Sequence, residues 1–364
     1  MEMESQVSSQ NETRKENKKI NSVLKLSILV LNCFVLGIGN TGGPLLLRLY
    51  FIKGGKKIWL SSWLETGGWP VMFLPLAVSY LYRRRTNPNR ETKVCFITPA
   101  LFMASAALGL LIGVDDYFYS YGASRLPVST SSLIISTQLA FTAVFAFLIV
   151  RQKFTSYSIN AVVLLTVGAV VLGLHASGDR PGNESNKQYF IGFFMTLAAA
   201  ILYGFVLPMV ELTYKKANQV VTYSLVMEMQ MVMSLFATAF CTVGMLINKD
   251  FQTIPGEAKV FALGEAKYYV LLSFSAIVWQ FFFMGAIGVI FCASSLLSAV
   301  IIAVQLPLTE VLAVLIFHEK FKAEKAVSLF LSLWGFFSYT YGEFKETNKK
   351  KKAAKSEVMT ITDS

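Results

Sequence analysis

Residues 131–154 read SSLIISTQLAFTAVFAFLIVRQKF, and residues 298–321 read SAVIIAVQLPLTEVLAVLIFHEKF. The two stretches align in a single register, which matches Gln138, Thr142 and Lys153 with Gln305, Thr309 and Lys320. Apolar residues pair easily by chance in a chain this hydrophobic, so the matched polar residues are the informative ones. A second sequence match, earlier in the chain and at a slightly shorter residue offset, pairs Pro44 with Pro208. The sequence therefore predicts an internal duplication.

The composition around these stretches is typical of a polytopic membrane protein. Of the 364 residues, 54% are hydrophobic and only 15% are charged, whereas soluble domains carry about 25% charged residues. A membrane-spanning helix needs about 20 mostly apolar residues, and the gaps between charged residues accommodate ten such segments. The predicted spans are 26–47, 62–82, 95–119, 127–150, 156–177, 190–211, 223–247, 268–290, 294–317 and 325–342.

A duplication of ten spans gives five spans per copy. A unit with an odd number of spans inserts its second copy upside down, and such inverted repeats characterise secondary transporters. We therefore expect an all-α membrane protein with ten transmembrane helices in two inverted five-helix repeats. The first repeat covers residues 23–178 and the second covers residues 190–344, with an external loop at 179–189. The polar segments 1–22 and 345–364 are predicted to be disordered cytosolic tails.

The distribution of charge predicts the orientation in the membrane. The net charge is +11, and the basic runs Arg83–Arg85 and Lys349–Lys352 fall on the cytosolic side when the N-terminus is placed there. An even number of spans then puts both termini in the cytosol. The basic excess is thus a topological signal in tails and loops, and it predicts no nucleic-acid partner.

The residue types on which most enzymes depend are scarce. The four cysteines lie singly in apolar stretches, and the two histidines are His175 and His318, far apart in the chain. Neither a metal site nor a redox motif is predicted from them. The sequence also has no phosphate-binding loop, HExxH zinc motif or nucleophile elbow. We expect a protein that is not an enzyme.

Two segments are predicted to break their helices beside a cavity. Asn40–Pro44 is rich in glycine at the end of the first span, and Gly67–Pro70 follows Glu65 near the start of the second span. A broken helix frees backbone groups that can bind a ligand. Glu65 is a candidate proton-coupling residue, because an ionisable group within a span is costly in lipid and faces a cavity or a partner. The alternative for Glu65 is a solvated acid at the membrane surface.

Acidic residues near the ends of the third and seventh spans are further candidates. Asp115 and Asp116 are adjacent, and neighbouring positions on a helix point about 100° apart, so at most one is expected to face a narrow cavity. Asp115 shares a helix face with Tyr119. Asp115 and Glu228 are the preferred candidates for binding and releasing the coupled proton, while a structural capping or ion-paired role stays the alternative for Asp115.

Amide and aromatic side chains complete the predicted binding site. Gln138 and Gln305 occupy matching positions of the repeat, and each amide presents donors and an acceptor that suit the edge of a nitrogen heterocycle. Ordinary glutamine hydrogen bonds between helices are the alternative. Trp279 and Phe283 share a face of the eighth span and can stack on a flat ring, or simply pack. The further polar candidates for substrate binding are Glu228, Gln230 and Gln280.

Several segments together resemble the plant purine permeases. They are Gly42–Phe51, Asp115–Gly122, Leu126–Ile135, Gln138–Phe141, His318–Phe321 and Ser332–Phe336. The resemblance extends over about residues 26–344, nearly everything but the tails. It implies the ten-helix drug/metabolite transporter fold, and proton-coupled import of adenine, cytokinins and related purine derivatives. The plasma membrane is the expected location.

The resemblance also implies a flat, largely neutral substrate and suggests how it is bound. Trp279 or Phe283 would stack on the ring, while Asn40, Gln138, Glu228 and Gln280 would contact its edge. The expected partners are a purine or cytokinin, the lipid bilayer and the coupled proton, with no cofactor, and the chain is expected to be a monomer or homodimer. The alternatives are a carrier of another heterocycle, such as an alkaloid or vitamin precursor, a nucleotide-sugar carrier, a membrane enzyme and a receptor.

Overall fold

A computed structural model describes residues 2–86, 93–126, 131, 134–174, 186–317 and 323–362. These residues form the helices α1 (Glu2–Ile52), α2 (Ile58–Thr66), the short 3₁₀ helix η1 (Trp69–Met72), α3 (Phe73–Thr86), α4 (Pro99–Arg125), α6 (Gln138–Val150), α7 (Ser156–Leu174), α8 (Asn186–Lys215), α9 (Tyr223–Ile247), α10 (Asp250–Val260), α11 (Glu265–Cys292), α12 (Ser295–Phe317) and α13 (Ala323–Thr362). Most of the predicted external loop, His318–Phe321 of the second repeat stretch, and much of the segment Leu126–Ile135 lie outside the described residues.

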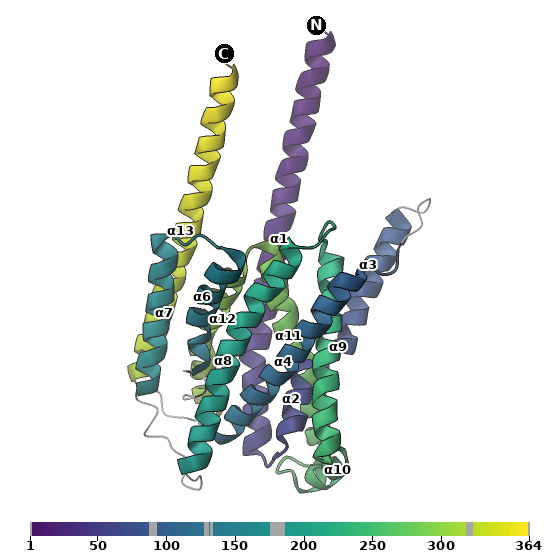
Figure 1. Cartoon of the computed structure of the whole chain (residues 1–364), viewed down its shortest axis with the longest axis vertical. Coiled ribbons are helices and arrows are strands. Elements are labelled where there is room, and N and C mark those ends of the chain that lie inside the picture. Colours follow the sequence, from purple (N-terminus) through teal and green to yellow (C-terminus); the bar gives the residue numbers. More distant parts are fainter. Residues whose placement is uncertain are drawn as a thin grey trace.

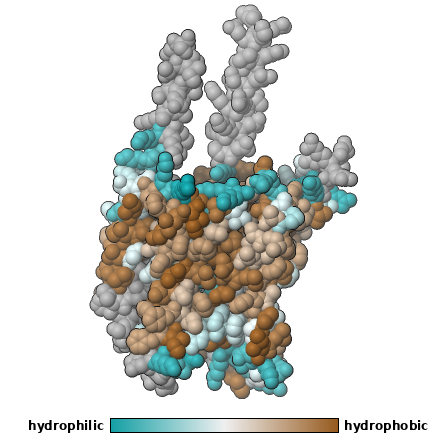
Figure 2. Space-filling view, viewed as in Figure 1, coloured by the Kyte–Doolittle hydropathy of each residue, from teal (hydrophilic) through white to brown (hydrophobic). Residues whose placement is uncertain are grey.

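The helices lie side by side in a bundle (Figure 1). Six of them contain segments long and apolar enough to cross a membrane: Val23–Ile52, Pro99–Arg125, Lys187–Lys215, Tyr223–Ile247, Glu265–Cys292 and Ser295–Phe317. Figure 2 shows a wide apolar belt between two polar rims. Large apolar side chains of these segments are exposed, among them Phe34, Phe194 and Phe274, each more than half exposed. Exposing so much apolar surface to water is unfavourable, whereas contact with the hydrocarbon of a bilayer is not. The chain is therefore a multi-pass membrane protein.

Both termini lie at the same end of the bundle (Figure 1). We call this end the terminal face, and the end that carries α10 the opposite face. The two polar tails, predicted to be disordered, continue α1 and α13 as helix in the structure, from Glu2 and to Thr362. Extending a helix that already exists adds one hydrogen bond per residue and avoids the unfavourable nucleation step.

Local sequence signals explain where two of the helices begin. The Thr98 hydroxyl accepts a 3.4 Å hydrogen bond from the Leu101 N–H at the start of α4, and Pro99 follows directly as the first helical residue. The Thr222 hydroxyl does the same for the Leu225 N–H of α9, at 3.3 Å. A threonine cap satisfies one of the free N–H groups of the first turn.

The predicted second span is interrupted where its sequence contains glycine and proline. Helix α2 ends at Thr66, Gly67 forms its C-cap, and η1 begins at Trp69 with Pro70 among its first residues. Proline has no N–H to give and is tolerated in a first turn. The break that the sequence predicts after Glu65 is therefore present in the structure.

The break predicted at Asn40–Pro44 is not present. Helix α1 runs without interruption through Pro44, so this prediction was wrong. A proline inside a membrane helix loses one backbone hydrogen bond, which neighbouring helices can offset. Here Asn40 ties the segment to α12, since its Nδ2 donates to the Ile302 carbonyl at 3.1 Å.

The two halves of the chain are packed closely together. Helix α1 lies against α11 along much of its length, and a Cβ atom added at Gly39 of α1 would overlap the backbone of Phe282 on α11. Only a residue without a side chain permits this approach. Helix α4 packs on α8 and α9, and α7 pairs with α13. A cavity lies between these packed groups, in the interior of the bundle.

Candidate functional site

The cavity contains about 530 Å³ of space not filled by protein atoms, including space that is open to solvent. Helices α1, α2, α4, α6, α8, α11 and α12 all contribute to its wall. The lining residues are Asn40, Pro44, Glu65, Asp115, Asp116, Tyr119, Ile135, Gln138, Ala199, Tyr203, Trp279, Phe282, Phe283, Ile302 and Leu306. Seven of the predicted site residues meet here: Asn40, Glu65, Asp115, Tyr119, Gln138, Trp279 and Phe283.

Three carboxylic acids line one region of the cavity. Glu65 of α2 accepts a 2.7 Å hydrogen bond at Oε1 from the Ser120 hydroxyl. Asp115 and Asp116 of α4 are both buried, and Asp115 Oδ1 and Asp116 Oδ2 have no hydrogen-bond partner in the described part of the chain. These oxygen atoms are available to a proton or to a donor group of a ligand.

The expectation that only one aspartate would face the cavity was wrong. Glu65 on α2, both aspartates on α4 and Tyr203 on α8 all line the cavity. The cavity therefore extends around more of α4 than a narrow cleft would, and it reaches two adjacent positions of the helix.

The two matching glutamines have different positions. Gln138 lines the cavity, whereas Gln305 is not among the lining residues and accepts a 3.1 Å hydrogen bond at Oε1 from Asn40 Nδ2. Asn40 itself lines the cavity and also donates to the Ile302 carbonyl. Gln305 thus fixes the orientation of a lining amide and does not line the cavity itself.

Aromatic rings form a second region of the wall. Tyr119 meets Trp279 edge-to-face, with ring centroids 5.9 Å apart and planes at 78°. Tyr203 stacks on Phe282 at 5.6 Å and 30°. The indole Nε1 of Trp279 is buried and has no hydrogen-bond partner among the described residues. A flat ligand can contact ring faces here and also accept a hydrogen bond from the indole.

Sequence reasoning did not single out two of these aromatic residues, Tyr203 and Phe282. Tyr203 lies one helical turn after Ala199, and both line the cavity from α8. A spacing of four residues places two side chains on the same helix face, but it occurs in many spans and does not show which face lines a cavity. Phe282 precedes Phe283 directly, and a run of three phenylalanines, Phe281–Phe283, does not reveal which ones face inward.

Gln230 and Gln280 lie outside the cavity wall. Gln280 Nε2 donates to the carbonyl oxygens of Glu65 at 3.3 Å and Thr66 at 3.0 Å. Gln230 Nε2 donates to the Ser234 hydroxyl at 2.9 Å. That hydroxyl in turn donates to Gln280 Oε1 at 3.4 Å. The structure therefore places these two amides behind Glu65, where they contact the protein and not the cavity.

Glu228 also lies outside the cavity wall, near the terminal face. Its Oε2 accepts hydrogen bonds from the backbone N–H groups of Phe96 at 2.7 Å and Ile97 at 2.9 Å, and from the Cys95 thiol at 3.4 Å. Burial, with a smaller contribution from the negative charge of Glu228, raises the pKa of that thiol. Glu228 thus joins the α3–α4 loop to α9 and is not among the described residues that line the cavity.

A second cavity of about 480 Å³ adjoins the first. The two share Pro44, Tyr119, Ile135 and Leu306 as lining residues. The second is also lined by Leu47, Arg48, Phe51, Ala123, Leu126, Ser131 and Thr309. Because it includes the last turns of α1 and α4, it lies toward the opposite face (Figure 1).

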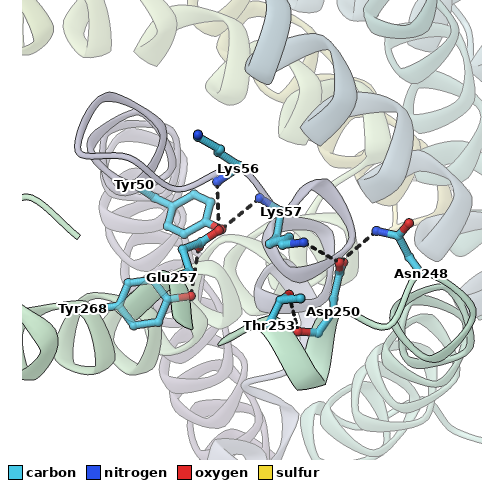
Figure 3. Close-up of polar contacts among 8 residues, drawn as sticks. All are labelled: Tyr50, Lys56, Lys57, Asn248, Asp250, Thr253, Glu257 and Tyr268. Atoms are coloured by element: carbon cyan, nitrogen blue, oxygen red, sulfur yellow. Dashed lines mark hydrogen bonds and ion pairs between the residues drawn. The ribbon is translucent and has the colours of Figure 1, made fainter. Parts of the chain in front are cut away.

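A cluster of buried polar groups joins both halves at the opposite face (Figure 3). Glu257 of α10 accepts hydrogen bonds from the hydroxyls of Tyr50 at 2.6 Å and Tyr268 at 3.0 Å, and from the Lys56 backbone N–H at 3.2 Å. Asp250, at the start of α10, lies 3.4 Å from Lys57 Nζ. These contacts hold the α1–α2 loop against α10 and α11.

Comparison with known proteins gives a consistent result. A sequence model for purine nucleobase transmembrane transport matches residues 27–350. Purine permease 3 of Arabidopsis thaliana is 54% identical over 332 residues, which cover 91% of this chain and 95% of that protein. Purine permease 2 of the same plant is 53% identical over 340 residues, with 90% and 95% covered. A crystal structure of another protein, 17% identical, has a TM-score of 0.58 and covers 86% of this chain and 98% of its own, which supports the fold alone.

Proposed function

The chain belongs to the purine permease family of membrane transporters, and from that premise we propose that it imports purine bases and their derivatives by proton-coupled secondary transport. The observation that carries the proposal is the central cavity, in which three carboxylic acids and a set of aromatic rings meet. Adenine and cytokinins are the proposed substrates. A transporter of this kind is not an enzyme, and it needs no cofactor besides the coupled proton.

The chemistry of the wall favours a flat, uncharged heterocycle. Trp279 and Phe283 present aromatic surface, and Tyr119 closes the site beside Trp279. Asn40 and Gln138 supply amide groups for the edge of the base. A purine carries ring nitrogens that accept hydrogen bonds and N–H groups that donate them, so it can bind both the amides and the unpartnered carboxylate oxygens.

The acids Glu65, Asp115 and Asp116 are the proposed site of proton coupling. They lie in one buried cavity, and none of them forms an ion pair with a lysine or arginine within the described residues. Like charges that share one buried cavity repel one another, and a proton bound within the cluster relieves that repulsion. Binding of a proton from an acidic exterior would favour substrate binding, and its loss to a more alkaline interior would favour release.

Helix packing supports two inverted five-helix repeats of the drug/metabolite transporter type. Helix α1 packs on α11 and α12, and α8, its counterpart in the second half, packs on α4 and α6. The pairs α7–α13 and α6–α12 join counterparts to each other. This is the pattern expected when a two-fold axis relates the halves, and it suits alternating access to a central site. In the proposed orientation the terminal face is cytosolic, and the membrane is the plasma membrane.

A carrier of another heterocycle or of a nucleotide sugar is the second candidate. None of the described residues that line the first cavity is a lysine or arginine, which disfavours a phosphate group there. Arg48 lines the second cavity, and its positive charge favours a substrate with an anionic substituent there. An alkaloid or vitamin precursor of similar flat shape would use the same aromatic wall.

Uptake of labelled adenine by purified protein in liposomes tests the proposal. With an acidic exterior and an alkaline interior, uptake should saturate with substrate and exceed equilibrium, and it should fall to equilibrium when a protonophore abolishes the gradient. Competition by a panel of cytokinins, alkaloids and a nucleotide sugar would rank the substrates. Asp115→Asn should weaken the gradient-driven part of uptake. Nonsaturable uptake that ignores the pH gradient would refute the proposed function.

A further inference from the structure

Helix α11 presents two functionally different faces at adjacent residues. Trp279 and Phe283, one turn apart, line the cavity. Gln280 is only 1% exposed and faces the break in α2. Its Nε2 donates to the carbonyl oxygens of Glu65 and Thr66, the last two residues of α2. The final carbonyls of a helix have no partner within the helix, so Gln280 supplies the partner that the break requires.

The Gln280 amide is itself held in place. Its Oε1 accepts a 3.4 Å hydrogen bond from the Ser234 hydroxyl of α9, which in turn accepts one from Gln230 at 2.9 Å. The backbone is equally constrained, because a Cβ atom added at Gly68 would overlap the Ala276 carbonyl of α11. The broken helix therefore has little room to move independently of α9 and α11.

Glu65 is held at both its backbone and its side chain. The backbone carbonyl binds Gln280 of α11, and the side-chain carboxylate binds Ser120 of α4 inside the cavity. A ring that stacks on Trp279 and Phe283 presses on the same helix that holds Glu65 through Gln280. Any small displacement of α11 would thus change the position of Glu65 relative to Asp115 and Asp116.

We propose that Gln280 is a positioning residue that couples substrate binding at Trp279 and Phe283 to the acid cluster, by holding the end of α2 that carries Glu65. It acts through Glu65 and does not touch the substrate. This inference rests on the proposed function, since it needs a purine in the cavity and a proton on the acids. It also assigns Gln230 and Ser234 the role of fixing Gln280.

The test compares two transport assays on Gln280→Leu in liposomes. Leucine fills similar space but cannot donate to the two carbonyls. Exchange of labelled for unlabelled adenine, with no pH gradient, needs substrate binding and alternating access but no net proton movement, and we expect it to stay within about twofold of the unaltered protein. Accumulation driven by a pH gradient should fall at least fivefold. A purely structural role would reduce both activities together.

Two further variants keep the test decisive. Ser234→Ala removes the group that holds the Gln280 amide, and it should give a weaker loss of the same selective kind. Asn160→Leu is the matched control, because Asn160 Nδ2 donates to the Ser338 hydroxyl across α7 and α13 at 3.0 Å and neither residue lines the cavity. It should leave both assays unchanged.

Every outcome separates this inference from the proposed function. If the unaltered protein shows no gradient-driven accumulation, the proposed function fails. If it does, but Gln280→Leu accumulates adenine equally well, or loses exchange and accumulation in parallel while folded, the inference is overturned. Should Gln280→Leu fail to fold, Ser234→Ala decides, and normal behaviour in both assays would overturn the inference.

Discussion

The backbone N–H of Phe96 donates a 2.7 Å hydrogen bond to the carboxylate of Glu228, and the next N–H, of Ile97, binds the same oxygen at 2.9 Å. Gln219 reinforces this contact by donating to the Phe96 carbonyl at 3.0 Å. The α3–α4 loop of the first half is thereby attached to the start of α9 in the second half. A buried carboxylate that binds two backbone N–H groups stabilises the fold at the terminal face.

Glu228→Ala should therefore destabilise the protein without weakening substrate binding. Loss of the carboxylate leaves two N–H groups without their acceptor, which costs about 2–4 kcal/mol, while Glu228→Gln keeps one acceptor oxygen and costs less. Thermal unfolding in detergent measures the difference. The KM for adenine should stay within about twofold for Glu228→Gln. A large rise in KM with unchanged stability would contradict this assignment.

Cys95 should report on the same contact. The thiolate is the form that reacts with maleimides, and burial together with the Glu228 charge raises the pKa of this thiol. Below that pKa the labelling rate should be low and should rise with pH. Glu228→Gln removes the nearby negative charge, which lowers the pKa of the thiol and should speed labelling at pH 7. A Cys95→Ser variant gives the background from the other three cysteines, and equal rates with and without Glu228 would refute the contact.

Trp279 should contribute most of the aromatic binding surface. Stacking of a base on an aromatic side chain is worth about 1–3 kcal/mol, so Trp279→Ala should weaken adenine binding by about tenfold or more. Trp279→Phe retains a ring but loses the indole N–H, and it should have a smaller effect. Binding measured by calorimetry or by the KM of uptake distinguishes the two variants. Trp334→Ala is the matched control, because Trp334 is exposed on the outside of α13. It should leave adenine binding unchanged.

Glu257 should stabilise the opposite face through several bonds at once (Figure 3). Tyr50→Phe and Tyr268→Phe each remove one hydroxyl donor and should each cost about 0.5–1.5 kcal/mol. Glu257→Ala removes the shared acceptor and should cost more than either. Because both hydroxyls bind the same carboxylate oxygen, the double phenylalanine variant should not equal the sum of the two single effects. Strict additivity in thermal unfolding would show that the two bonds act independently.

The sequence alone could predict the class of protein and many of the lining residues. Asp115, Gln138 and Trp279 stand out because acidic, amide and indole groups are conspicuous within apolar spans, and all three line the cavity. The interruption after Glu65 was predictable because glycine and proline act locally on the backbone.

The sequence could not predict which polar residues face the cavity and which bind the protein. Gln280 and Trp279 are adjacent, and only the packing of α2 against α11 shows that one holds a helix end while the other lines the wall. Glu228, near the start of α9, likewise has no partner that can be recognised from the sequence around it. The backbone N–H groups that bind it belong to a loop far away in the sequence. Such partners depend on tertiary contacts, which hydrophobic periodicity does not contain.

The close approach of Gly39 to the backbone of Phe282 limits how this transporter can change shape. The two backbones leave no room for a side chain between them, so α1 and α11 form one closely packed unit although they lie in different halves of the sequence. A conformational change of the bundle that preserves this contact would occur between the α1–α11 pair and the other helices. Conformational exchange would not follow the boundary between the two halves of the sequence.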